Sequence, residues 1–155
     1  MSTYPESENS PPTAEASFAA FFQLFASVRG TLDEALRQER IGLSLMHLAL
    51  LRYCQAHPGC SQQALAQAVG RDKGQIARLI REFEEQGLLT REQDAEDRRS
   101  QCLHLTAKAE AACEQFSHQE SIIAKRMFSA LSDAERSQFV GLLSTMKAGL
   151  QADQA

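Results

Sequence analysis

The stretch Asp72–Gly87, DKGQIARLIREFEEQG, is the segment from which the rest of the chain is interpreted. Its apolar residues are Ile76, Leu79, Ile80 and Phe83. Their spacing of three and four residues places them on one face of an α-helix, so the pattern predicts a helix that is buried on that side. Asp72 has a side chain suited to capping the start of this helix, and Gly87 can adopt the left-handed conformation that often ends one.

The opposite face of the predicted helix is polar and cationic near its start. It carries Gly74, Gln75, Arg78 and Arg81, and Lys73 precedes them. Guanidinium and carboxamide groups match the base edges in the major groove of DNA, and a glycine lets a partner come close to the backbone. This face therefore favours contact with double-stranded DNA.

A shorter helix is predicted just before this one. Ser61 is suited to cap its start, the sequence QQALAQAV follows, and Gly70 ends it. Two helices joined by a short turn that contains glycine are typical of a helix-turn-helix motif, in which the second helix contacts the bases.

The segment after Gly87 changes from helical to strand-like character. Residues 88–92 and 101–106 are rich in strand-compatible residues, and a polar, charged loop at 93–100 joins them. This pattern predicts a β-hairpin with Arg98 and Arg99 near its tip. A hairpin directly after such a helix predicts the wing of a winged helix-turn-helix.

Long helices are predicted on both sides of this unit. One is expected at 14–40, one at 43–55, one at 106–130, and a last one starts at a capping box, Ser132–Glu135. The first has four phenylalanines on one face, Phe18, Phe21, Phe22 and Phe25. A terminal helix this apolar must pack on something. A second copy of the chain is the expected partner, and packing within the same chain is the alternative.

Composition limits the class of protein. The chain has 155 residues, 43% of them hydrophobic, which suits one domain or two small units with a packed core. No apolar run approaches the roughly 20 residues that span a bilayer, and residues 1–13 are typical of a polar, disordered tail and not of a secretory signal. We therefore expect a cytoplasmic protein that does not bind membranes.

The net charge of the chain is −4, which argues against a nonspecific nucleic-acid binder. Residues 71–81 nevertheless hold four cations against one carboxylate.

The four cysteines are Cys54, Cys60, Cys102 and Cys113, and no CxxC pair occurs. A disulfide framework is not expected in a reducing compartment, so small buried thiols or thiols that sense a peroxide are the two interpretations. A zinc set that adds His104 and His118 to Cys102 and Cys113 has poor spacing for one site. We expect no metal and no cofactor. No nucleophile–base motif and no phosphate-binding glycine loop appears, so we expect no enzyme activity.

The stretch from Ile41 to Thr106 resembles the MarR family of bacterial transcriptional regulators. The resemblance is carried by SQQALAQAVGRDKGQIARLIREFEEQGLLTRE and by DAEDRRSQCLHLT, which has Asp97 and Arg99 at a wing tip and Leu105-Thr106 behind them. It implies a mainly α fold with a small β-hairpin, in which a winged helix-turn-helix at 41–106 lies between dimerisation helices at 14–40 and 107–155. It also implies a homodimer that represses transcription from a pseudo-palindromic DNA operator. Release would follow binding of a small phenolic or aromatic effector, or cysteine oxidation.

The resemblance also implies roles by position. Gly74, Gln75 and Arg78 fall where the family contacts the major groove, and Lys73 and Ser61 fall at backbone phosphates. Arg99 falls where the wing enters the minor groove, oriented by Asp97, and Arg81 and Arg98 are neighbouring cations. Two residues depart from the family pattern. Ala109 replaces a common glycine, and the first helix lacks the cysteine of the oxidant-sensing branch, which leaves Cys54 and Cys60 as alternatives.

An effector site is expected between the first two helices, near Phe22, Phe25, Met46 and His47. Core packing explains these four residues as well, and a histidine among apolar neighbours is often simply a packed one. Two other functions remain open on the sequence. One is a winged helix that contacts protein and does not read bases, and the other is a metal-responsive regulator that uses cysteine and histidine.

Overall fold

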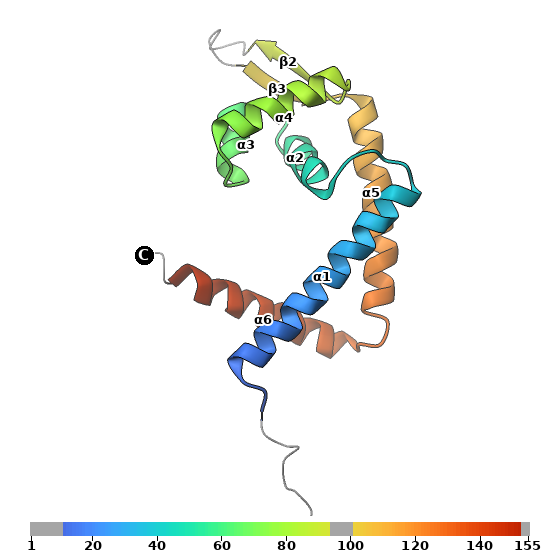
Figure 1. Ribbon diagram of the computed structural model, residues 1–155, viewed down its shortest axis with the longest axis vertical. Helices are drawn as coiled ribbons and strands as arrows, with labels where there is room; N and C mark the ends of the chain where they lie inside the picture. Colours follow the sequence, from blue (N-terminus) through green and yellow to red (C-terminus); the bar gives the residue numbers. More distant parts are fainter. Residues whose placement is uncertain (1–10, 94–100, 153–155) are drawn as a thin grey trace, which may run out of the picture. The chain divides into compact units, whose positions relative to one another are not determined.

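The computed structural model describes residues 11–93 and 101–152. Its elements are α1 (Ala14–Gln38), α2 (Leu45–Ala56), β1 (Cys60–Ser61), α3 (Gln62–Ala68), α4 (Lys73–Glu85), β2 (Leu89–Gln93), β3 (Gln101–Leu105), α5 (Ala107–Met127) and α6 (Asp133–Ala152) (Figure 1). The predicted class, mainly helical with a small antiparallel sheet, is confirmed. Most of the predicted N-terminal tail, and Asp97, Arg98 and Arg99, lie outside the described residues.

The chain forms two compact units, Met1–Cys113 and Glu114–Ala155, which divide inside α5. The first unit holds the predicted helix-turn-helix and its sheet. The second holds most of α5 and all of α6, and the rings of Phe128 and Phe139 pack there with centroids 5.5 Å apart. The predicted capping box at the start of α6 is confirmed, because Ser132 and Glu135 exchange hydrogen bonds between their side chains and backbone N–H groups. Among the described residues, no helix combines the length and apolar character needed to cross a membrane.

The sheet has three strands in the order β1-β3-β2, all antiparallel. The sequence predicted only the hairpin of β2 and β3, so the prediction of two strands was incomplete. The missing strand, β1, is two residues long, and Cys60 and Ser61 pair with Leu103 and Cys102. A strand this short has no periodicity of its own, and it forms because a distant segment, β3, lies beside it.

The core of the first unit lies between α2, α3, α4 and the inner face of the sheet. Its fully buried side chains include Leu48, Leu50, Leu51, Cys54, Leu65, Ile76, Ile80, Phe83 and Leu103. The predicted apolar face of α4 therefore does point inward, with Leu79 half-buried at its margin. A helix fixed in this way on one side must present its other side to solvent.

Both predicted ends of α4 are confirmed. Asp72 is the N-cap, and its Oδ1 accepts hydrogen bonds from the backbone N–H groups of Gly74 and Gln75. At the other end Gly87 has φ +68°, and the Leu88 N–H donates to the Phe83 carbonyl across 2.7 Å. These contacts make a Schellman ending. The helix is thus held at both ends by short-range bonds.

Replacing Gly87 with alanine should lower the free energy of unfolding by about 1–2 kcal/mol, the cost of the left-handed conformation for a residue with a Cβ. Nothing lies within 4 Å of a Cβ built at this position, so the cost is conformational and not steric. Urea unfolding measures it. Gly141→Ala is the matched control, because this glycine lies inside α6 and has no positive φ. There the same change should raise stability, by about 0.5–1 kcal/mol. Equal effects at the two positions would contradict the assignment of strain to Gly87.

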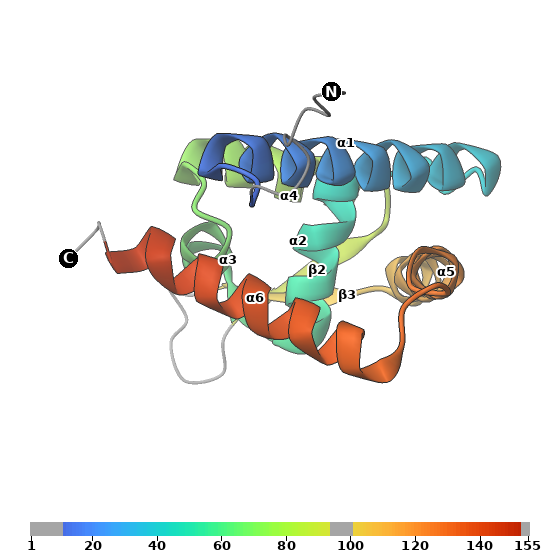
Figure 2. The ribbon, with the colours of Figure 1, turned by 90° about the horizontal axis from the view of Figure 1, so that it is seen from below.

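The phenylalanine-rich face of α1 is largely exposed in the part of the chain that the structure describes. Figure 2 shows α1 along its length as one unbroken helix, and Leu36 near its end is the buried residue on it. Phe18, Phe22 and Phe25 are 65%, 57% and 54% exposed. Their rings contact one another in sequence along the helix, with centroids 5.8 Å and 6.3 Å apart. These rings thus keep more than half of their surface exposed among the described residues, and their burial by a second copy of the chain stays a prediction.

Candidate nucleic-acid interface

The outward face of α4 carries the residues that the sequence predicted for it. Lys73, Gly74, Gln75, Arg78 and Arg81 are all exposed, whereas Ile76 and Ile80 between them are fully buried. The Arg81 Nε donates to the Ala77 carbonyl across 3.3 Å, so this guanidinium lies back along its own helix. The side chains of Gln75 and Arg78 are three positions apart, which places them one above the other on the helix surface.

The structure gives a second reason for a glycine at position 74, which the sequence did not reveal. A Cβ added at this position would lie 2.9 Å from the Asp72 Oδ1, the atom that caps the helix. A side chain here would therefore displace the cap as well as cover the backbone. The glycine leaves the start of α4 both firmly capped and open to a partner.

Ser61 is half-buried and caps α3, because its Oγ accepts a hydrogen bond of 3.1 Å from the Ala64 N–H. It also belongs to β1, where it pairs with Cys102 of β3. The helix-turn-helix and the sheet thus meet at this residue. Its predicted contact with a phosphate stays a prediction, and its cap role is confirmed.

The C-terminal end of α4 is held by three side chains from later in the chain. Arg91 of β2 pairs with Glu84 across 2.9 Å and also donates to the Gln101 side chain of β3 across 3.2 Å. The Thr106 Oγ1 donates to the Gly87 carbonyl, and the Lys108 Nζ donates to the Gln86 carbonyl. Cations near the last carbonyls of a helix also offset its dipole. The sequence did not predict these contacts with α4, because nothing in the local pattern links the three residues to that helix.

The ion pair of Arg91 and Glu84 joins β2 to α4, so we expect it to make a measurable contribution to the free energy of unfolding. In a double-mutant cycle of Arg91→Gln and Glu84→Gln, we expect a coupling energy of about 1 kcal/mol, near the upper end for exposed pairs. The two side chains are only 26% and 31% exposed, which limits solvent screening. Urea unfolding of the four proteins gives the coupling. Single effects that simply add would show that the pair contributes nothing.

The four predicted effector residues lie on two helices and differ in how far they are exposed. Phe22 and Phe25 are exposed on α1, Met46 is 38% exposed, and His47 is half-buried on α2. His47 completes a capping box with Ser44 at the start of α2, and its ring meets Phe83 of α4 edge to face at a centroid distance of 5.3 Å. His47 therefore packs against α4, the helix that carries Arg78, and its role in binding an effector stays a prediction.

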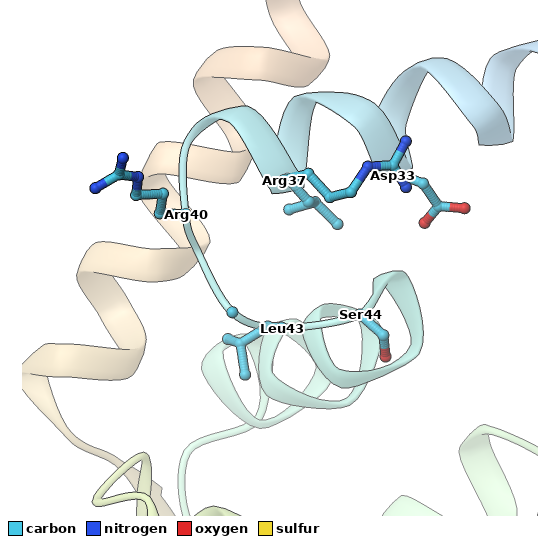
Figure 3. Close-up of a pocket in the computed structure, with 7 residues that line it drawn as sticks. Asp33, Arg37, Arg40, Leu43 and Ser44 are labelled. Atoms are coloured by element: carbon cyan, nitrogen blue, oxygen red, sulfur yellow. The ribbon is translucent and has the colours of Figure 1, made fainter.

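A cavity of about 570 Å³ opens between the end of α1 and the start of α2. Figure 3 shows Asp33 and Arg37 on the last turns of α1, and Leu43 and Ser44 on the other side of the space. Leu36, Arg40 and Gly42 complete its lining. The four predicted effector residues do not line this cavity. Arg37 is paired with Glu34, and that guanidinium together with the Gln38 amide lowers the pKa of the Glu34 carboxyl.

The zinc set of Cys102, His104, Cys113 and His118, raised above as an alternative, finds no support in residues 11–93 and 101–152. Within these ranges, no group of three or more histidine, cysteine or acidic side chains is arranged to hold a metal ion.

Comparison with known proteins agrees with this geometry. Residues 41–100 match the MarR family. The HTH-type transcriptional regulator BilQ of Clostridium symbiosum is 32% identical over 111 residues, which span 72% of this chain and 76% of BilQ. The chain belongs to the MarR family. The predictions that it is a winged-helix transcriptional regulator, and not an enzyme, are confirmed by this membership.

Other relatives of this MarR-family chain support the same assignment. A protein of Thauera aromatica named as a transcriptional regulatory protein for the hcr operon is 38% identical over 98 residues, which span 63% of this chain but only 58% of that relative. A solved mutant of S. aureus MepR superposes with a TM-score of 0.73 at 25% identity, covering 86% of this chain and 97% of MepR. Streptococcus pneumoniae FabT, solved in complex with DNA, shares the fold with a TM-score of 0.83 at 16% identity, covering 90% and 99% of the two chains.

Proposed function

We propose that this chain is a sequence-specific DNA-binding repressor whose helix α4 lies in the major groove. The observation that carries the proposal is the start of α4, where Gln75 and Arg78 are exposed on a helix held at both ends. An arginine pairs with the O6 and N7 of guanine, and a glutamine pairs with the N6 and N7 of adenine. Gly74 lets the helix backbone approach the groove.

The backbone of the DNA would be held by residues around this helix. Lys73 stands at the N-terminus of α4, where a cation and the helix dipole both favour a phosphate. Ser61 marks the start of α3, the other helix of the motif. Arg98 and Arg99, with Asp97 orienting Arg99, would place the wing in a narrow minor groove. Phosphate contacts of this kind require that log K falls linearly as log salt rises.

The acting species is a homodimer in this proposal. Exposed apolar faces of this size on a single chain indicate a surface that another protein covers. Such side chains occur on α1, at Phe18, Phe22 and Phe25, and on α6, at Val140, Leu142, Met146 and Leu150. Two copies related by a two-fold axis would present two α4 helices roughly 34–36 Å apart, one DNA turn, to a pseudo-palindromic operator.

Release by a small aromatic effector completes the proposal. The effector must bind one separation of the two α4 helices more tightly than the other, since equal affinity shifts nothing. The contact between His47 of α2 and Phe83 of α4 supports a route from the predicted site at Phe22, Phe25, Met46 and His47 to the DNA-contacting helix. Such a regulator would act in the cytoplasm.

Selection from a pool of random duplexes, followed by footprinting upstream of the chain's own gene, tests the proposal. The expected result is a motif of two inverted half-sites whose centres are one helical turn apart. Recovery of no motif would favour the alternative, a winged helix that contacts protein. Repeating the binding measurement at several salt concentrations adds an independent check, because a flat response would exclude the phosphate contacts.

A further inference from the structure

Arg91 is a charged side chain on the inner face of the small sheet. β2 is an edge strand, since the sheet runs in the order β1-β3-β2, and Arg91 lies opposite Leu103 of β3. Alternate residues of a strand share a face, so Arg91 lies on the same side as Leu89. Leu89 and Leu103 are 2% and 1% exposed. The guanidinium of Arg91 therefore occupies a position at which an apolar side chain is expected.

Packing alone does not explain an arginine at this position. Its Nη2 lies 2.9 Å from the Glu84 Oε2 of α4, and its Nη1 donates to the Gln101 side chain of β3 across 3.2 Å. Its Nε is buried and has no hydrogen-bond partner among the described residues. A buried N–H without an acceptor costs free energy, whereas leucine or methionine would fill the same space without that cost. What the arginine adds is a bridge, because one planar group joins α4, β2 and β3.

This bridge is the directional contact between α4 and the hairpin of β2 and β3 that lies away from the turn joining them. The bond from the Thr106 Oγ1 to the Gly87 carbonyl holds the turn itself, where the chain has just left α4. Apolar packing of Leu89 in the core has no directional preference. An ion pair and a hydrogen bond from one guanidinium do require a defined geometry. One point of attachment leaves a hairpin free to turn, and a second point fixes its direction.

We infer that Arg91 is a positioning residue, which fixes the direction of the hairpin relative to α4 so that both elements reach DNA together. This inference rests on the proposed function, in which α4 lies in the major groove and Arg98 and Arg99 lie in the minor groove. The duplex sets the spacing of its two grooves, so a hairpin that turns freely on α4 loses conformational entropy each time the chain binds. Arg91 acts through α4 and the hairpin and does not itself contact DNA, because its guanidinium is held between Glu84 and Gln101.

Residual dipolar couplings of the backbone N–H groups test the direction of the hairpin without any DNA. In the parent chain, one alignment tensor should fit α4 and the hairpin together. In Arg91→Gln each of the two should still fit by itself, but the hairpin couplings should shrink or require a tensor different from that of α4. Glu84→Gln should give the same result, since it removes the other half of the ion pair. Glu85→Gln is the matched control, because it removes an exposed carboxylate from the next position of α4 and should still fit one tensor.

DNA binding gives a second readout, which a general loss of stability would not reproduce. The selected operator is made in two forms, one with A·T-rich flanks and one with G·C-rich flanks, and fluorescence anisotropy measures the affinity for each. The parent should prefer the A·T-rich flanks by at least about fivefold, because a narrow minor groove attracts the arginines of the wing. Arg91→Gln should reduce this preference to within about twofold and keep its affinity for the G·C-flanked form. Partial unfolding would instead lower both affinities by the same factor.

A charge-reversed variant makes the test specific to the ion pair. Arg91→Glu combined with Glu84→Arg rebuilds the pair with its ends exchanged, and it should restore part of the flank preference that either single change removes. The inference is overturned if one tensor still fits Arg91→Gln, if that variant weakens binding to both duplexes equally, or if the parent ignores the flanks. A parent that selects no motif at all contradicts the proposed function instead, and the dipolar couplings then still decide whether Arg91 fixes the direction of the hairpin.

Discussion

Replacing Arg78 with alanine should abolish sequence-specific DNA binding and leave the fold unchanged. The side chain is exposed on the outward face of α4, so its loss removes no core contact. A guanidinium that pairs with a guanine edge contributes about 1–3 kcal/mol of discrimination, and a symmetric dimer loses the contact twice. The expected loss is therefore about 2–6 kcal/mol, or from about 30-fold to more than 1,000-fold in affinity for the selected duplex. Fluorescence anisotropy at fixed salt measures it, and circular dichroism checks the helix content.

Two further variants separate base recognition from charge. Arg78→Lys keeps the positive charge but not the planar fork that pairs with guanine, so nonspecific affinity should stay while specificity falls. Arg29→Ala removes an exposed cation from α1, where it pairs with Asp33, and should leave DNA binding within about threefold of the parent. If Arg78→Ala still prefers the selected duplex to a random one as strongly as the parent does, α4 does not read bases through this residue.

The ends of α4 were predictable from sequence because the atoms that fix them lie within a few residues of one another. Asp72 caps the N–H groups two and three positions on, and Gly87 closes the other end with Leu88 and Phe83. The buried stripe was equally local, since helical periodicity alone assigns Ile76 and Phe83 to one face. Together these fix which side of the helix faces solvent, so the exposed position of Gln75 and Arg78 followed from the sequence.

The contacts that orient α4 were not predictable, because each joins segments with no common pattern. Arg91 reaches Glu84 from a strand, and Lys108 reaches the Gln86 carbonyl from the start of α5. The strand β1 depends on β3, which follows it by some forty residues. The closeness of Cys54 and Cys60 has the same origin, since the turn between α2 and β1 brings two thiols together that the sequence shows only as six positions apart.

Replacing both Phe22 and Phe25 with glutamate should convert the proposed dimer to a monomer. Both rings are more than half exposed on α1, so a partner chain is what would bury them. Burying one phenylalanine contributes about 1.5–3 kcal/mol, and a two-fold interface loses four rings in this variant. The change also places four carboxylates where apolar groups would meet. We expect the dissociation constant of the dimer to rise by more than about 1,000-fold, measured by sedimentation equilibrium.

A monomer contacts only one half-site of the operator. The double variant should therefore bind the selected operator far more weakly than the parent chain does. A duplex that contains a single half-site should be bound about equally by the variant and the parent. Gln23→Glu is the matched control, because it adds a carboxylate to the same stretch of α1 without removing a ring. It should keep the dimer mass and the operator affinity. Two results would contradict this prediction: a parent chain that sediments as a monomer at micromolar concentration, or a double variant that keeps the mass of a dimer. Either result would show that these phenylalanines do not form a dimer interface. It would also remove the basis for two α4 helices that contact one palindromic operator.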